Sequence, residues 1–332
     1  RCSSAASDVY KRQSDSCPCL PSQLVEELIG ELKQVKERKT LLEARVRLCK
    51  VVAELDPECT KEAAELALRK AVEKGGEEFE RAMAVWLWRV FPELPVTVAA
   101  ELVSCYNVQS TSVPLNRAKR RGLMRSTDVL VHLFSGKQKW KGVRGTLLEI
   151  ERERGLDLHS PDLWAFLVRL ACNGSIQGVV AGPPCRTFSR LRDGHGPGEV
   201  RARAGAERWG RSDCTDAELA KVFGDSVLVM KTLVLYELAS LFRGPAELSS
   251  EVFFAMEHPQ DPKEYLNHEA SDNRQYPSVW AWPEVEGIAA RKGLVKALFD
   301  QGALGHECVK PTCILTSSLK AVSYTHLRAH ET

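Results

Sequence analysis

The chain has 332 residues, and its 46 lysines and arginines nearly balance its 44 aspartates and glutamates, for a net charge of +2. This balance excludes a protein whose overall field attracts nucleic acid, so any such contact must come from local basic patches. The 11 cysteines follow no disulfide framework, which favours a reducing, intracellular compartment. The length is enough for one large domain and a smaller one.

Both ends of the chain resemble translations of one DNA adapter. The peptide Asp-Val-Tyr-Lys-Arg-Gln at 8–13 can be encoded by GATGTGTATAAGAGACAG. The reverse complement of that DNA encodes Val-Ser-Tyr-Thr-His, which stands at 322–326. We therefore interpret residues 1–13 and 322–332 as sequencing artefacts and leave them out of the expected fold.

Residues 14–106 predict an α-helical region. Apolar residues recur three or four positions apart between positions 24 and 49, with charged residues between them. Asp56 and Pro57 interrupt this pattern, and Thr60 is suited to cap a second helix. The region has no evident titratable cluster or glycine loop, so we expect a helical platform whose partner is unknown. Residues 107–127 follow as a basic linker.

Two β-strands are predicted next, at 128–134 and 146–151. The first runs into a Phe-Ser-Gly turn, which by itself is a weak signal. Only residues 137–145 separate the strands, whereas a parallel crossover with its helix usually needs at least ~10–12 residues. Either the helix between them is reduced to about one turn, or the two strands are not adjacent parallel partners.

The most informative motif is Gly-Pro-Pro-Cys at 182–185, after the apolar run 176–181. Two prolines fix the backbone and remove two donors, so the chain leaves the predicted strand in a stiff, extended form. Cys185 is then held beyond the carboxyl end of the strand, where open α/β sheets bind ligands. The alternative is a buried cysteine in an ordinary proline turn.

The segment 186–211 carries seven arginines and five glycines, which predicts a charged, mobile loop outside the core. Arginines pair with phosphates and stack on bases, so the loop is suited to close over a polynucleotide. A solvated insertion is the alternative. Arg186 and Arg190 are also close enough in sequence to lower the pKa of the Cys185 thiol. A second basic patch stands at 117–125.

Residues 222–242 predict a packed helix and no membrane span, because Lys231 and Glu237 interrupt the apolar run. The apolar strand predicted at 252–256 delivers Glu257 at its end. That carboxyl group is either a partner for Cys185 or a surface glutamate. No metal site is expected, because His306, Cys308 and Cys313 lack a fourth ligand with fitting spacing.

These motifs together resemble the DNA cytosine-5 methyltransferases. Gly-Pro-Pro-Cys-Arg-Thr-Phe-Ser-Arg at 182–190 resembles their nucleophile motif, and the turn 134–136 resembles their cofactor-binding motif. The final stretch, 299–317, is similar to the closing segment of divergent members from viruses and retroelements of protists. The resemblance covers about residues 114–318.

The resemblance implies an α/β, Rossmann-like S-adenosylmethionine-dependent methyltransferase fold over 128–321, a mostly parallel sheet flanked by helices, after the N-terminal α-helical region. It implies DNA as partner, no membrane, and a nuclear location in a eukaryote. The implied catalytic residues are Cys185, Glu257 and Arg190. The implied S-adenosyl-L-methionine site comprises Phe134, Ser135, Gly136, Glu149, Glu151, Asp157 and Pro183, with Glu149 preferred for the ribose. The implied nucleic-acid contacts are Arg186, Ser189, Arg192, Arg201, Arg203, Arg208 and Arg211.

In the implied mechanism the target base is flipped into a pocket, Cys185 attacks carbon 6, and Glu257 protonates or hydrogen-bonds N3. Two departures from the family keep other functions open. Residues 137–140 replace the expected further glycines, and a clear Gln-x-Arg-x-Arg segment is missing. A catalytically inactive nucleic-acid-binding module of a retroelement protein is the first alternative, and an RNA cytosine methyltransferase is the second.

Overall fold

The computed structural model describes residues 58–103, 113–136, 145–188, 199–243, 251–265, 276–304 and 309–318, together with 43, 46 and 56. The helix predicted between positions 24 and 49 falls almost wholly outside these ranges, as do Ser189, Arg190 and Arg192 of the predicted site.

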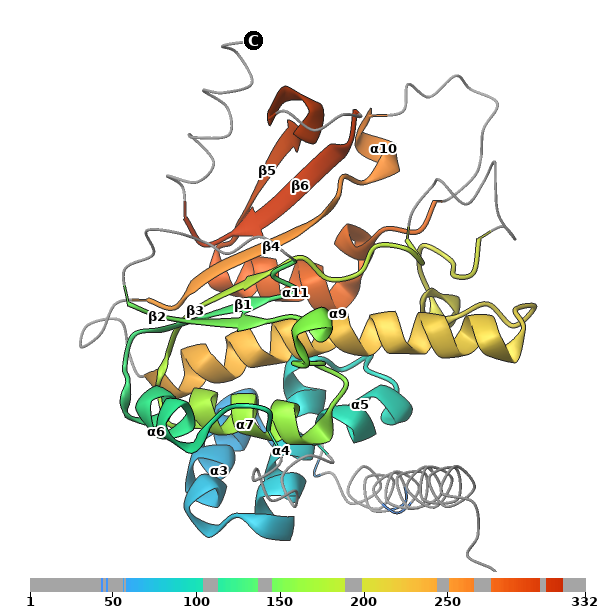
Figure 1. The fold of residues 1–332 in the computed structure, drawn as a ribbon. Helices are drawn as coiled ribbons and strands as arrows, with labels where there is room; N and C mark the ends of the chain where they lie inside the picture. Colours follow the sequence, from blue (N-terminus) through green and yellow to red (C-terminus); the bar gives the residue numbers. More distant parts are fainter. Residues whose placement is uncertain are drawn as a thin grey trace, which may run out of the picture.

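The described chain forms an α/β fold around one six-stranded sheet (Figure 1), with the strand order β2-β1-β3-β4-β6-β5. The first four strands in this order are parallel to one another, and β6 is antiparallel to both β4 and β5. The strands are β1 (Val129–Leu133), β2 (Thr146–Ile150), β3 (Ile176–Ala181), β4 (Phe253–Pro259), β5 (Val295–Asp300) and β6 (Pro311–Thr316). The expected mostly parallel sheet behind N-terminal helices is confirmed.

The structure decides between the two arrangements left open for the first strands. β1 and β2 are adjacent and parallel, from Val129 opposite Thr146 to Leu133 opposite Ile150. The alternative that these strands are not adjacent parallel partners is therefore wrong, and residues 137–144 between them lie outside the described residues. At β3, Gly178 lets the neighbouring strand come close, since a Cβ there would lie 2.7 Å from Leu130 Cδ1.

β4 is longer than predicted and includes Glu257. Its pairing with β3 ends at Met256, opposite Ala181. Its pairing with β6 continues, with Glu257 opposite Ile314 and Pro259 opposite Thr312. Glu257 is therefore the first residue of β4 beyond the end of the pairing with β3, held in a strand by a partner distant in sequence.

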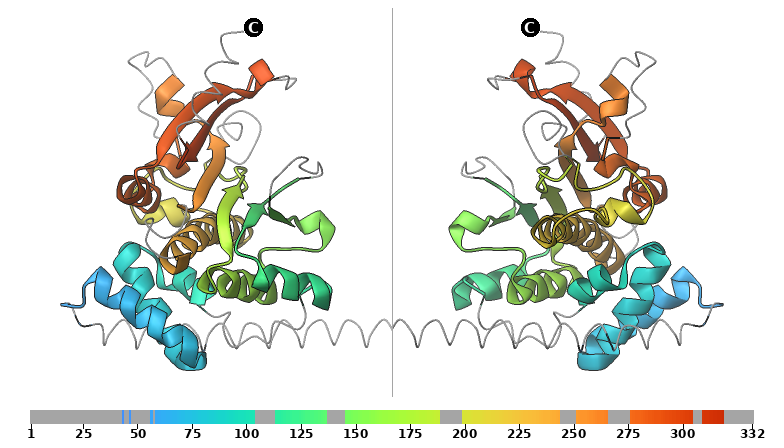
Figure 2. Two further views of the ribbon diagram at one scale, coloured as in Figure 1. Left: turned by 90° about the vertical axis from the view of Figure 1, so that its left-hand side faces the viewer. Right: turned by 90° about the vertical axis from the view of Figure 1, so that its right-hand side faces the viewer.

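Helices α7 and α9 lie beneath the sheet, and α3, α4 and α5 lie on their outer side (Figures 1 and 2). The α-helices are α3 (Lys61–Lys74), α4 (Gly76–Val90), α5 (Val96–Val103), α6 (Arg117–Arg125), α7 (Pro161–Cys172), α9 (Asp216–Arg243), α10 (Pro262–Tyr265) and α11 (Pro283–Lys292). Short 3-10 turns are η1 (Arg152–Arg154), η2 (Ala206–Trp209), η3 (Val279–Ala281) and η4 (Gln301–Leu304). The described helices thus flank the sheet in layers.

Local sequence explains where several helices begin. Thr60 Oγ1 accepts a hydrogen bond from Ala63 N at 3.2 Å, which confirms the predicted N-cap of α3. Ser160 caps α7, and Pro161 occupies its first turn, where no backbone donor is needed. The predicted basic linker contains a helix, α6, because the Asn116 side chain accepts from Lys119 N at 2.8 Å.

α9 is the packed helix that the sequence predicts, with both of its central charges satisfied. Lys231 Nζ donates to the Leu158 carbonyl at 2.9 Å. Glu237 pairs with Arg291 at 3.0 Å and with Lys292 at 3.3 Å. Of the helices in the described ranges, none has the length and apolar character needed to cross a membrane.

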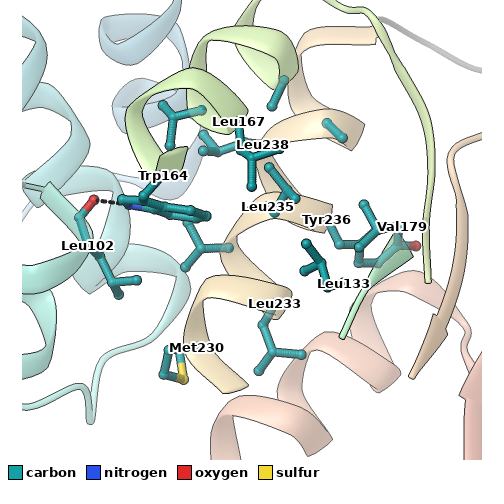
Figure 3. Packing of buried hydrophobic residues seen from close by; sticks show 14 of the residues in the cluster. Leu102, Leu133, Trp164, Leu167, Val179, Met230, Leu233, Leu235, Tyr236 and Leu238 are labelled. Carbon is teal, nitrogen blue, oxygen red and sulfur yellow. Dashed lines mark hydrogen bonds between the residues drawn. The ribbon is translucent and has the colours of Figure 1, made fainter. Parts of the chain in front are cut away.

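The N-terminal helices share one hydrophobic core with the sheet. Trp164 of α7 is fully buried, and its indole N–H donates to the Leu102 carbonyl of α5 at 2.9 Å (Figure 3). Met230 and Leu233 of α9 belong to the same cluster, as does Leu133 of β1 (Figure 3). The helices of residues 58–103 are therefore packed against the α/β unit.

Candidate active site

The predicted nucleophile lies at the point where the sheet reverses its strand order. From β1 the chain moves outward to β2 and then crosses to β3 on the other side of β1. Open α/β sheets bind ligands in the crevice at the carboxyl ends of two such strands. The segments that follow β1 and β3 are the Phe134–Gly136 turn and Gly-Pro-Pro-Cys at 182–185, respectively. Gly182 N donates to the Leu133 carbonyl at 3.4 Å, which ties them together.

Cys185 is half-buried after the two prolines, and a turn fixes its backbone, since Phe188 N donates to the Cys185 carbonyl at 2.9 Å. Pro183 is buried. The Cys185 side chain thus starts from a rigid segment at the sheet edge, as the sequence predicts.

Glu257 projects to the same edge from β4. A Cβ on Gly182 would lie 3.3 Å from Glu257 Oε2, so this carboxylate oxygen lies close against the turn. The other oxygen, Oε1, accepts from Gln301 Nε2 at 3.1 Å and lies 3.5 Å from Lys310 Nζ. The two carboxylate oxygens therefore face different sides, one the cysteine turn and one the η4–β6 segment.

The protonation of Cys185 depends on burial and on three charges around it. Burial raises the pKa of the Cys185 thiol above its usual value, and Lys310 partly offsets that rise. Glu257 and Asp225 raise the pKa of the thiol further. The lowered thiol pKa expected from Arg186 is therefore wrong, since Arg186 is bound to Asp225 and, among the described residues, Lys310 is the cation that lowers the pKa of the thiol. Arg190, the other cation of this prediction, lies outside the described residues.

Asp225 of α9 anchors the segment behind the cysteine. This carboxylate is fully buried. It accepts from Arg186 Nε at 3.2 Å and Nη2 at 2.9 Å, and from Thr187 Oγ1 at 3.0 Å. Three charge-assisted hydrogen bonds to one carboxylate fix residues 186 and 187 against the helix.

The segment 199–211 corrects the prediction of a loop too charged to enter the core. Arg201 is fully buried and donates to Thr187 Oγ1 at 2.7 Å, Ser226 Oγ at 3.2 Å and the Val222 carbonyl at 3.2 Å. Its guanidinium also lies 3.9 Å from the centre of the Phe188 ring. Burial lowers the pKa of Arg201, to about 9. Its donors face the protein, so Arg201 is a structural residue and not a nucleic-acid contact.

Two more predicted nucleic-acid contacts have structural partners. Arg203 pairs with Asp261 at 2.7 Å. Arg208 is buried and pairs with Glu284 at 2.8 Å and with Glu93 at 3.0 Å, which links the N-terminal helices to α11. Both guanidinium groups have carboxylate partners within the fold. Arg208 is also buried and is therefore a structural residue, whereas Arg203 stays a predicted nucleic-acid contact.

Arg186 and Arg211 keep exposed surface. Their side chains are 61% and 37% exposed, and each is paired with one aspartate, Asp225 and Asp213 respectively. The predicted contacts Ser189 and Arg192, and the catalytic candidate Arg190, lie outside the described residues.

His258 packs the cysteine turn against β4. It is buried, with its ring centre 4.9 Å from that of Phe188 and 6.1 Å from that of Trp280. Burial, and then the nearby Arg201 and Lys310 cations, lower the pKa of His258 to about 3. The imidazole is therefore neutral at physiological pH, and it serves the packing of the site.

The predicted cofactor residues at the ends of β1 and β2 lie together. Gly136 N donates to Glu151 Oε2 at 2.8 Å, so the second acidic candidate closes the turn. Phe134 has a positive φ of 60°, which is uncommon outside glycine and sharpens that turn. Glu149 pairs with Arg154 at 3.0 Å.

Two buried polar atoms at these strand ends have no hydrogen-bond partner among the described residues: Ser135 Oγ and Glu149 Oε1. Buried polar atoms are nearly always paired, so unpaired ones near a ligand crevice fit a bound group with hydroxyl and amine functions. S-adenosylmethionine carries both. Asp157, the remaining candidate, accepts from His159 N at 2.9 Å and pairs with Arg152 at 3.4 Å. Ser135 and Glu149 are therefore the residues of this cluster that could hold such a group.

Three residues of this site are not predicted by the sequence motifs: Lys310, Gln301 and Asp225. Lys310 stands in the closing segment that resembles divergent methyltransferases, but only the pairing of β6 with β4 brings it to Glu257. The described residues contain no group of three or more His, Cys, Asp or Glu side chains that could hold a metal ion, and Cys313 is buried in β6.

Comparisons with models of protein families, with curated proteins and with solved structures found no match to this chain. The functional assignment therefore rests on the motifs and on the geometry described above.

Proposed function

We propose that the protein is an S-adenosylmethionine-dependent cytosine-5 methyltransferase that acts on DNA through a covalent bond to Cys185. One observation carries the proposal: Cys185 and Glu257 extend from adjacent parallel strands to the same edge of the sheet, with Oε2 of Glu257 against Gly182. A thiolate and a carboxyl group side by side are the two groups that addition to a cytosine ring requires.

The strand order of the sheet supports the assignment of a Rossmann-like methyltransferase fold. An antiparallel strand, β6, is inserted between β4 and β5, and the other strands run parallel. This arrangement is typical of the Rossmann-like methyltransferase fold that the sequence motifs imply. The reversal point between β1 and β3, where the Gly182 N–H donates to the Leu133 carbonyl, supports a cofactor site next to the nucleophile candidate.

In the proposed reaction the Cys185 thiolate forms a bond to carbon 6 of a flipped cytosine. The electron pair of the C5–C6 bond moves toward carbon 5, and Glu257 protonates or hydrogen-bonds N3 to offset the charge on the ring. After carbon 5 has gained a methyl group, loss of its proton supplies the electrons that re-form the C5–C6 double bond. The bond from Sγ to carbon 6 breaks in the same step and releases the thiolate.

S-adenosylmethionine would supply the electrophilic methyl group. Glu149 is placed to accept hydrogen bonds from the ribose, Ser135 offers a hydroxyl group, and Gly136 lets the backbone approach closely. Glu151 holds the turn in shape through its bond with Gly136 N.

A trapping experiment tests the proposal. DNA with 5-fluorocytosine blocks the final elimination, because carbon 5 then carries fluorine in place of the proton. We expect the full chain, with S-adenosylmethionine, to form a denaturation-resistant adduct that peptide mass assigns to Cys185. Cys185→Ser should abolish the adduct, since a serine hydroxyl is a far weaker nucleophile at neutral pH. Cys214→Ser removes another half-buried thiol and should leave the adduct intact.

Each other outcome has a defined meaning. An adduct at Cys214 overturns the assignment of the nucleophile. An adduct on fluorinated RNA alone makes the protein an RNA cytosine methyltransferase. DNA binding with no adduct over a broad set of sequences favours the inactive nucleic-acid-binding module.

A further inference from the structure

A lysine lies beside the proposed nucleophile. Lys310 Nζ is 3.5 Å from Glu257 Oε1 and acts electrostatically on Cys185. The side chain comes from the residue just before β6, whereas Cys185 follows β3 and Glu257 lies in β4. Three segments that are far apart in sequence thus meet at one edge of the sheet.

The Lys310 backbone is fixed independently of its amine. Lys310 N donates to Asp300 Oδ1 at 3.0 Å. The Lys310 carbonyl accepts from Gln301 N at 3.2 Å and from Thr312 Oγ1 at 2.8 Å. The turn between β5 and β6 therefore keeps its bonds when the amine is removed, and the long side chain is free to serve the site.

We propose that Lys310 is a positioning residue that orients the Glu257 carboxylate and stabilises the thiolate of Cys185. The inference takes Cys185 as the nucleophile from the proposed function. Gln301 and Lys310 together hold Oε1 of Glu257, which leaves Oε2 toward the cysteine turn. On ionisation the Cys185 proton passes to water, and the ammonium group keeps all its protons.

Other charges near Cys185 do not replace this cation. Asp225 and Glu257 both oppose ionisation of the thiol. Arg186 is held by Asp225 through two of its nitrogens, so their charges offset each other. His258 packs behind the turn in its neutral form. Lys310 is thus the cation that acts on the thiolate within the described part of the chain, and its loss should change the ionisation of Cys185.

The test needs neither DNA nor cofactor. The rate at which iodoacetamide alkylates Cys185, followed by peptide mass against pH, reports the thiol pKa. Lys310→Met should shift this profile upward, with alkylation at pH 7 slowed about tenfold for a shift of one pH unit. Lys310→Arg should restore most of the rate, because it retains the charge. Glu257→Gln should speed alkylation, because it removes an opposing charge.

Lys296→Met is a matched control. Lys296 lies in the neighbouring strand β5, its side chain is 38% exposed like that of Lys310, and it faces Glu264 at 3.7 Å. Its removal should leave the Cys185 profile unchanged. A Lys310→Met profile equal to that of the unmodified chain overturns the inference.

The two proposals can fail separately. A Lys310-dependent profile without a 5-fluorocytosine adduct retains the electrostatic role of Lys310 and rejects the methyltransferase. An adduct that forms with an unaltered Lys310→Met profile retains the methyltransferase and rejects the role of Lys310.

Discussion

Replacing Asp225 with alanine tests whether the segment behind Cys185 is held by α9. The substitution removes a buried carboxylate that accepts hydrogen bonds from Thr187 and from two nitrogens of Arg186. Thr187 in turn accepts from buried Arg201, so the change also leaves that cation without its nearby negative charge.

The magnitude follows from burial. A hydrogen bond to a charged group contributes about 1.5–3 kcal/mol, and the buried Thr187 bond falls in that range. Arg186 is 61% exposed, so solvent screens its pair, which adds only about 0.2–1 kcal/mol. The free energy of unfolding should therefore fall by about 2–4 kcal/mol.

The assay is urea denaturation followed by tryptophan fluorescence, with hydrogen exchange of residues 186–188 as a local measure. Asp213→Ala, which removes the exposed partner of Arg211, should change neither. A loss below about 1 kcal/mol for Asp225→Ala, with unchanged exchange, would refute the reasoning, because such a value is ordinary for a surface substitution.

Two further predictions concern pH and the cofactor. Because the pKa of His258 is lowered to about 3, only the unfolded state gains its proton as pH falls from the usual histidine value. The free energy of unfolding should therefore fall toward pH 4. His258→Phe should reduce its slope against pH by up to about 1.4 kcal/mol per pH unit. Urea denaturation that gives the same slope for the variant and the unmodified chain would contradict this prediction. Glu149→Ala should weaken S-adenosylmethionine binding in calorimetry by about 1.5–3 kcal/mol, whereas exposed Glu153→Ala should not; equal affinities would exclude Glu149.

The sequence by itself determined the strands and the place of the nucleophile candidate. Apolar runs bounded by turns predict β1 to β4, because a buried strand needs a continuous run of apolar side chains. Two prolines after β3 stiffen the exit from the strand and put Cys185 at the sheet edge. These signals are local, so they can be read without knowing what packs against them.

Only the tertiary structure decided which partner each charged side chain has. Composition predicts that Arg201 and Arg208 lie in a charged, mobile loop outside the core, yet both are buried, since carboxylates, hydroxyls and aromatic rings from distant segments surround them. Lys310 reaches Glu257 because β6 inserts antiparallel between β4 and β5. The partners of a charged side chain are set by strand order and helix packing, and these depend on contacts between residues far apart in the chain.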